Sequence, residues 1–162
     1  MKLFIGKELE GRHQGRSTLF VEGYVPAEKI LQCLGQEHEQ LYFGARYHGK
    51  SNSVVAEDIV EEVLAKLNGS GAPSIVTVDL CGEYLHRWVP LMRQHRRLEI
   101  MLTLPFTFRK CVADGLEELR KAGLSSRVQI KIRGAESILV LPLTDAVSNM
   151  WHGYKEDRLI WT

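Results

Sequence analysis

The residues from Gly44 to Ser51 combine the types that hold a phosphate group, at the spacing G-x-x-x-x-G-K-S. Glycines allow backbone N–H groups to approach a polyanion, and the start of a helix adds more N–H donors and the positive end of its dipole. The Lys50 ammonium would neutralise phosphate charge, and the Ser51 hydroxyl would bind Mg²⁺. The pattern predicts a phosphate-binding loop whose ligand-binding residues are Gly44, Arg46, Gly49, Lys50 and Ser51.

The stretches on either side of this loop fit the strand and the helix that must flank it. Residues 39–43 are mostly apolar and aromatic, which is typical of a short strand. Residues 52–67 place apolar side chains on one face at helical spacing. The simpler alternative is an ordinary β–α connection, in which the glycines serve turns and Ser51 caps the helix.

An acidic residue closes the next predicted strand. Residues 74–80 are apolar nearly throughout, as expected of a parallel strand covered on both faces, and Asp79 lies near their end. An acid at this position can hold a metal ion at the ligand crevice, or it can cap the following helix. His48 lies near the end of the preceding strand and is a candidate general base, because histidine side chains titrate near neutral pH.

Over residues 41–80 the chain resembles the P-loop (Walker A) nucleotide-binding family. Besides the loop, the sequence D-L-C-G from Asp79 is similar to the D-x-x-G segment of GTP-binding members, and H-G-K from His48 is similar to the same sequence in translational GTPases. The resemblance implies that Lys50 meets the β- and γ-phosphates, and that Ser51 and Asp79 hold Mg²⁺. ATP or GTP would be the ligand, Mg²⁺ the cofactor and NTP hydrolysis the activity. No N-K-x-D or T-K-x-D motif follows, so no base preference is implied.

A second candidate phosphate site lies at residues 103–110. Thr107, Arg109 and Lys110 supply a hydroxyl and two cations where a strand is predicted to end and a helix to begin. The alternative is a helix N-cap followed by exposed basic residues.

Composition is that of an ordinary globular protein. The 162 residues are 44% hydrophobic and 25% charged, which predicts one domain over residues 1–162, large enough to bury a core. No apolar run approaches the roughly 20 residues that span a bilayer, and no signal peptide is apparent, so we expect a cytoplasmic protein without a membrane partner. The three cysteines form no C-x-x-C pair.

Charge is unevenly distributed along the chain. Residues 87–133 contain eleven basic and four acidic side chains, a net charge of +7, so the remainder carries −6 of the overall +1. This asymmetry favours an anionic partner such as nucleic acid. The alternative is a solvated face without a partner.

Strand and helix patterns alternate along the chain, which predicts an α/β fold. Strands are expected at 18–25, 39–43, 74–80 and 98–104, helices at 27–34, 52–67, 83–95 and 106–122, further strands at 127–133 and 137–143, and a loop at 6–17. We expect a three-layer sandwich, with a mainly parallel sheet of about five to six strands, helices on both faces and antiparallel strands at the ends. Ligands of such sheets bind outside the carboxyl ends of the strands.

Three functions follow as hypotheses. The first is a nucleotide- or phosphate-binding protein that acts as a Mg²⁺-dependent NTPase. The second is a Rossmann-like module that recognises a nucleotide signal or nucleic acid through a basic surface, without hydrolysis. The third is a structural subunit whose aromatic C-terminal residues, 149–162, form a docked extension or a homo-oligomer contact.

Overall fold

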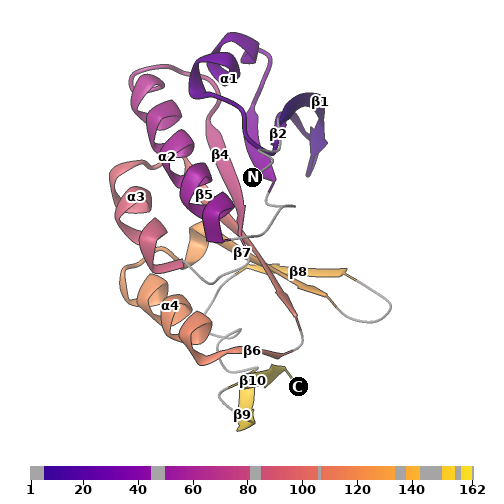
Figure 1. The fold of residues 1–162 in the computed structure, drawn as a ribbon, viewed down its shortest axis with the longest axis vertical. Helices are drawn as coiled ribbons and strands as arrows, with labels where there is room; N and C mark the ends of the chain where they lie inside the picture. Colours follow the sequence, from indigo (N-terminus) through magenta and orange to yellow (C-terminus); the bar gives the residue numbers. More distant parts are fainter. Residues whose placement is uncertain are drawn as a thin grey trace. The chain divides into compact units, whose positions relative to one another are not determined.

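The chain packs as two compact units (Figure 1). Unit 1 comprises Met1–Asp79 and Gln94–Glu99, and unit 2 comprises Leu80–Arg93 and Ile100–Thr162. The computed structural model describes residues 6–44, 50–80, 85–105, 107–133, 138–142, 151–155 and 158–161.

Strands and helices alternate as the sequence predicts. The first half of the chain forms strands β1 (Lys7–His13), β2 (Arg16–Glu22), β3 (Gln40–Gly44) and β4 (Ile75–Leu80), and helices α1 (Ala27–Cys33) and α2 (Lys50–Lys66). The second half forms η1 (Leu85–Arg87), α3 (Trp88–Gln94), β5 (Leu98–Pro105), β6 (Thr107–Arg109), α4 (Lys110–Lys121), η2 (Ser125–Arg127), β7 (Val128–Arg133), β8 (Ile138–Pro142), β9 (Trp151–Lys155) and β10 (Arg158–Trp161).

The sheet is mixed and mostly parallel. Its strand order is β1-β2-β3-β4-β5-β7-β8, and a small second sheet has the order β6-β10-β9. The pairs β2–β3, β3–β4 and β5–β7 are parallel, whereas β1–β2 and β7–β8 are antiparallel. The predicted α/β class, with a mainly parallel sheet and antiparallel strands at its ends, is confirmed.

The register of unit 1 shows which side chains face the helices. Glu8 of β1 forms an ion pair with Lys29 of α1, at 3.7 Å, so this side of the sheet is the helical face. Glu8 pairs with Val21, and Val21 pairs with Phe43 of β3. Phe43 in turn pairs with Val78 of β4, and paired residues share a face. The alternate residues lie on the opposite face, which we call the second face; it carries Phe20, Tyr42 and Thr77.

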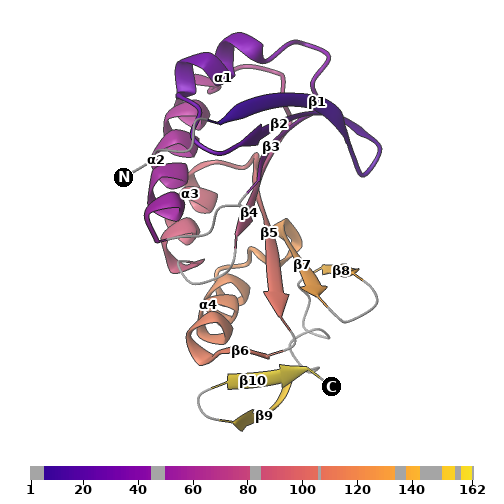
Figure 2. The same ribbon diagram turned by 45° about the vertical axis from the view of Figure 1, so that its right-hand side comes forward.

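Both helices of unit 1 lie on the helical face. Helices α1 and α2 contact each other, and both views place them on the same side of β2, β3 and β4 (Figures 1 and 2). These strands follow one another in chain order, and right-handed crossovers that advance in one direction put every helix on one side. The sequence predicted helices on both faces; within unit 1 the described helices cover one face only.

The hydrophobic core of unit 1 fills the space between this helical face and the two helices. Its side chains are at most 2% exposed and include Leu19, Val21, Leu41, Val76, Val78, Ile30, Val60, Val63 and Leu64. Burial of one such side chain stabilises the fold by about 1.5–3 kcal/mol. Of the residues on the apolar face predicted for 52–67, Val63, Leu64 and Leu67 are buried, whereas Ile59 is half-buried and its neighbour Val60 is buried instead.

Residues 7–22 form an antiparallel hairpin, so the prediction of a loop over residues 6–17 is wrong. His13 pairs with Arg16, and the two residues between them, Gln14 and Gly15, have φ values of 51° and 78°. This is the geometry of a tight type I′ turn, which a residue followed by glycine favours. The sequence of β1 is mostly charged and polar, so it was not recognised as a strand. Charged side chains are common on edge strands such as β1.

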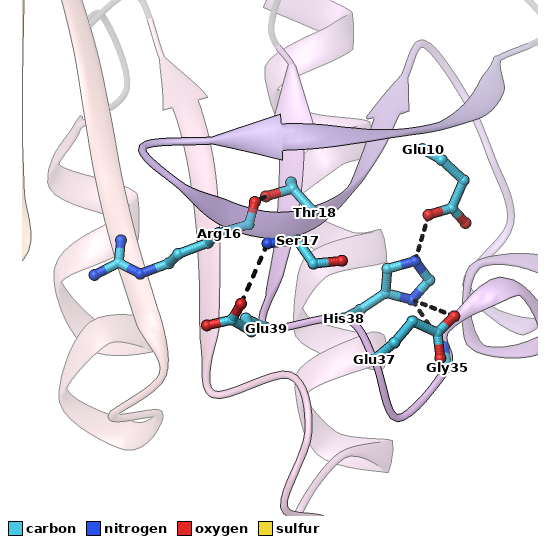
Figure 3. A network of polar contacts seen from close by, with 8 residues as sticks. All are labelled: Glu10, Arg16, Ser17, Thr18, Gly35, Glu37, His38 and Glu39. Carbon is cyan, nitrogen blue, oxygen red and sulfur yellow. Dashed lines mark hydrogen bonds and ion pairs between the residues drawn. The ribbon is translucent and has the colours of Figure 1, made fainter.

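A buried histidine ties the hairpin to the connection between α1 and β3 (Figure 3). Nδ1 of His38 accepts a hydrogen bond from the Gly35 N–H at 2.8 Å, and Nε2 lies 2.6 Å from Oε2 of Glu10. Because Nδ1 accepts, the ring proton is on Nε2 and is donated to Glu10. Close by, the Ser17 N–H donates to Glu39. Both nitrogens of His38 thus serve the fold.

Unit 2 departs from the predicted helices at two points. The pattern over 83–95 divides into η1 and α3, which places Pro90 in the first turn of α3, where its missing N–H has no intrahelical partner in any case. The helix predicted over 106–122 begins only at Lys110, because residues 107–109 form β6 and pair with β10. Gly123, at φ 75°, ends α4 as predicted.

The remaining strands of unit 2 follow the sequence closely. β7 and β8 correspond to the strands predicted at 127–133 and 137–143 and pair antiparallel. Residues of the aromatic C-terminal segment form β9 and β10, and Leu159 of β10 lies opposite Phe108 of β6. The expectation of one domain with a docked extension over 149–162 stays a prediction.

Candidate phosphate site at the carboxyl edge of unit 1

The carboxyl ends of three parallel strands meet at one edge of unit 1. β2 ends at Glu22, which pairs with Gly44 at the end of β3. Phe43 pairs with Val78 of β4, so Asp79 follows at the same level of the neighbouring strand. The edge therefore brings together the first residue of the predicted loop and the predicted acid, as parallel topology requires.

The predicted loop runs between β3 and α2 at this edge. Strand β3 ends at Gly44 and helix α2 begins at Lys50, so the strand–loop–helix context is confirmed. Arg46, His48 and Gly49 lie outside the described residues. Lys50 and Ser51 are the first two residues of a 17-residue helix whose first turn contains no acidic residue. The positive end of this helix dipole is thus not offset by a carboxylate of its own first turn.

Asp79 is held by a tyrosine of the neighbouring strand. The hydroxyl of Tyr42 donates a hydrogen bond to Oδ2 of Asp79 at 3.0 Å. Burial of the ring and the adjacent Asp79 carboxylate raise the pKa of Tyr42 well above its usual range. Tyr42 therefore remains a protonated donor and fixes the orientation of the acid. Asp79 was predicted as a site residue from the sequence. Tyr42 was not, because it lies 37 residues earlier in the chain.

The face on which Asp79 lies bears on its predicted role as a metal ligand. Its neighbour Val78 is on the helical face, so Asp79 is on the second face with Tyr42 and Thr77. Helix α2, which begins with Lys50 and Ser51, packs on the helical face. The side chain of Ser51 lies outside the described residues, so the Mg²⁺ site shared between Ser51 and Asp79 stays a prediction.

Gly44 is not required by the backbone conformation. It does not have a positive φ, and a Cβ built on it would lie 3.7 Å from the Val21 carbonyl oxygen and 3.9 Å from Cγ of Glu22. Both are ordinary van der Waals distances. Among the described atoms, neither φ nor a close approach therefore requires glycine at this position.

Polar and aromatic side chains form a network on the second face of β2, β3 and β4. The side-chain amide of Gln40 donates to Oγ1 of Thr77 at 2.6 Å, and its Oε1 lies 3.2 Å from the hydroxyl of Thr18. All three residues are buried. The rings of His13 and Tyr42 lie 4.7 Å apart between centroids. Sequence reasoning missed this layer, although Thr18, Gln40 and Thr77 are polar residues inside otherwise apolar strands.

The second candidate phosphate site does not have the predicted form. Thr107 and Arg109 belong to β6 and pair with Ile160 and Arg158 of β10. They do not open a helix, because α4 begins at Lys110. Of the three predicted residues only Lys110 lies at a helix start.

Several residues of the basic segment serve the fold. Arg97 donates to the Pro73 carbonyl at 3.2 Å and to that of Ser70, so it holds the connection between α2 and β4. Arg120 pairs with Glu117 one turn earlier in α4, which lowers the pKa of that carboxyl. Arg87, Arg93 and Arg96 are exposed. The sequence block is thus not a single set of free cations.

The described residues lack two kinds of feature. They contain no cluster of three or more histidine, cysteine, aspartate or glutamate side chains that could hold a metal ion. Nor does that part of the chain include a helix long and apolar enough to cross a bilayer. Cys33 is exposed, although free cysteines are usually buried.

Comparison with protein families, curated proteins and solved structures found no match for this chain.

Proposed function

We propose that the protein binds the phosphate groups of a nucleotide at the connection between β3 and α2. The observation that carries the proposal is the position of the G-x-x-x-x-G-K-S sequence, between the carboxyl end of a parallel strand and the start of a long helix. Phosphates bind at such helix starts because N–H groups and the helix dipole converge there. The absence of an acid from the first turn of α2 favours an anion.

Lys50 is the residue on which the proposal depends most. An ammonium at the first position of α2 adds a full positive charge to the partial charge of the helix end. The backbone N–H groups of the loop would supply the directional contacts. In hydrolysis His48 would act as the general base, and Ser51 and Asp79 would hold the Mg²⁺ ion that offsets phosphate charge.

Titration of ATP and GTP by calorimetry tests this proposal. We expect Lys50→Ala to weaken binding about tenfold or more, since hydrogen bonds to charged groups contribute about 1.5–3 kcal/mol. Lys66→Ala is the matched control, because Lys66 lies in the last turn of the same helix and pairs with the exposed Glu62. Equal nucleotide affinities of the wild type and Lys50→Ala would show that the loop does not bind the phosphates.

A further inference from the structure

Strand β1 is an exposed edge of the sheet in unit 1. Among the described strands it pairs with β2 alone, over seven residues without a register shift. Lys7, Leu9, Glu10, Gly11 and Arg12 are exposed, so this edge is open to solvent. A long, regular edge strand of this kind, without proline or a bulge, can pair with a strand of another chain.

Alternate residues of β1 direct their backbone groups away from β2. The Ser17 carbonyl accepts a hydrogen bond from the Glu39 N–H at 2.9 Å, and the Ser17 N–H donates to the Glu39 side chain, so the backbone of Ser17 faces β3. Arg12, which lies opposite Ser17, therefore does not exchange hydrogen bonds with it, and the N–H and C=O of Arg12 point outward. Since hydrogen-bonded and non-hydrogen-bonded pairs alternate along a ladder, the same holds for Glu8 and Glu10.

These outward-facing residues restrict how a second copy of β1 could pair antiparallel with the first. They must lie opposite one another, so the two-fold axis passes through a residue rather than between residues. Among positions 8–12, an axis at Glu8, Glu10 or Arg12 would place that residue opposite itself. An axis at Leu9 would place Glu8 opposite Glu10. An axis at Gly11 places each Glu10 opposite the Arg12 of the other copy, which is the arrangement without like charges face to face.

Both members of this charge pair are accessible on the helical face. The side chain of Glu10 is 69% exposed, although one of its carboxylate oxygens accepts the hydrogen bond from His38. Arg12 donates from one guanidinium nitrogen to the Gly15 carbonyl at 2.8 Å, and a guanidinium carries five N–H donors. Two copies can therefore form two symmetric pairs of Glu10 with Arg12.

The second face of β1 carries apolar surface at the same place. Leu9, which lies opposite Phe20, is 40% exposed. A Cβ on Gly11 would lie 2.9 Å from Cε2 of Phe20, so the half-buried Phe20 ring lies against the position of Gly11. Glycine at the axis thus lets this ring extend toward the edge of the sheet. A second copy placed about this axis would cover Leu9 and Phe20 and remove apolar surface from water.

We propose that two copies of this chain associate through β1, in an antiparallel pair centred on Gly11 that joins their two sheets. The contact consists of backbone hydrogen bonds at Glu10 and Arg12, the two ion pairs between these residues, and the apolar contacts of Leu9 and Phe20. The association is weak, because a single strand edge buries little surface. It does not depend on the proposed phosphate site.

Sedimentation velocity of the full-length protein over increasing micromolar concentrations tests this contact. We expect the wild type to shift from monomer to dimer, and Arg12→Glu to weaken the dimer at least about tenfold, because two ion pairs become pairs of like charge. Arg12→Lys, which keeps the charge, should stay within about threefold of the wild type. Arg96→Glu is the matched control, since Arg96 is also exposed and its substitution changes the net charge equally.

Arg12→Pro tests the backbone pairing separately. Proline at this position removes an N–H that points outward, so the hydrogen bonds between β1 and β2 are kept, as on other edge strands that carry proline. We expect this variant to remain monomeric over the same range of concentrations. Circular dichroism of each variant verifies the fold.

Two results would overturn the proposal. The first is a wild type that stays monomeric over the whole range of concentrations. The second is a dimer that Arg12→Glu and Arg12→Pro leave intact, which would place the contact elsewhere in the chain, such as residues 149–162. If Arg12→Pro does not fold, the comparison of Arg12→Glu with Arg96→Glu decides.

Discussion

At the scale of single residues, the pair of Tyr42 and Asp79 is the feature with the clearest chemistry. The phenol is buried, its pKa is raised by burial and by the adjacent carboxylate, and its hydroxyl holds the acid in place. Asp79 was predicted from the sequence because it is an acid near the end of an apolar strand, at the edge where ligands of parallel sheets bind. Tyr42 was not, since an aromatic residue in a strand is ordinary and its partner is distant along the chain.

The raised pKa of Tyr42 predicts how stability depends on pH. Above about pH 10 the phenol of the unfolded chain loses its proton, whereas the buried phenol keeps it. The folded state then binds more protons than the unfolded state, so the free energy of unfolding falls as pH rises, by at most about 1.4 kcal/mol per pH unit.

Urea unfolding of the wild type and Tyr42→Phe between pH 9 and 11.5 measures this contribution. We expect the variant to lose stability less steeply over that interval. The difference between the two proteins at pH 7 serves as the reference, because it contains only the lost hydrogen bond and packing. Parallel curves for the two proteins would contradict the prediction.

At the scale of elements, the backbone just before β1 lies very close to the backbone just after β2. The Gly6 N–H donates to the Tyr24 carbonyl at 2.7 Å. A Cβ on Gly6 would overlap the carbonyl oxygen of Glu22 and lie 2.7 Å from Cγ2 of Val25. Glycine is therefore required just before β1, for a reason that only the pairing of β1 with β2 creates.

Gly6→Ala is expected to destabilise the protein by about 1–3 kcal/mol, because the backbone on both sides must shift. Gly71→Ala, at an exposed position without neighbours, should change stability little or raise it by about 0.4–1 kcal/mol. Urea unfolding followed by tryptophan fluorescence measures both. A Gly6→Ala protein as stable as Gly71→Ala would show that the hairpin ends adapt freely.

At the scale of the whole molecule, a ligand that binds only the folded state must stabilise it. The stabilisation at a free concentration of 100 times Kd is about 2.7 kcal/mol. For a chain of this size that corresponds to a rise in Tm of roughly 5–10 °C. The effect does not depend on any assumption about hydrolysis.

Thermal unfolding with increasing ATP should therefore show a concentration-dependent rise in Tm for the wild type. Lys50→Ala should need about tenfold more ligand for the same rise, since its site has lost a charge-assisted contact. Lys66→Ala is expected to follow the wild type. A rise of the same size in all three proteins would point to a binding site elsewhere.

The sequence by itself determined the order and type of most elements, because helical and strand periodicities are local properties of the chain. It placed α2 within two residues of its start and β4 and β5 within one residue of either end. It failed at β1 and β6, which are stabilised by pairing with β2 and β10 rather than by their own composition.

Only the tertiary structure determined on which face of the sheet each side chain and each helix lies. The register of parallel strands put Asp79 with Tyr42 on the second face, and the chain-order arrangement of β2, β3 and β4 put α1 and α2 on the other. These are relations between residues far apart in the chain, so no local pattern encodes them. The sequence named the loop and the acid, and strand pairing set the side of the sheet on which the acid lies.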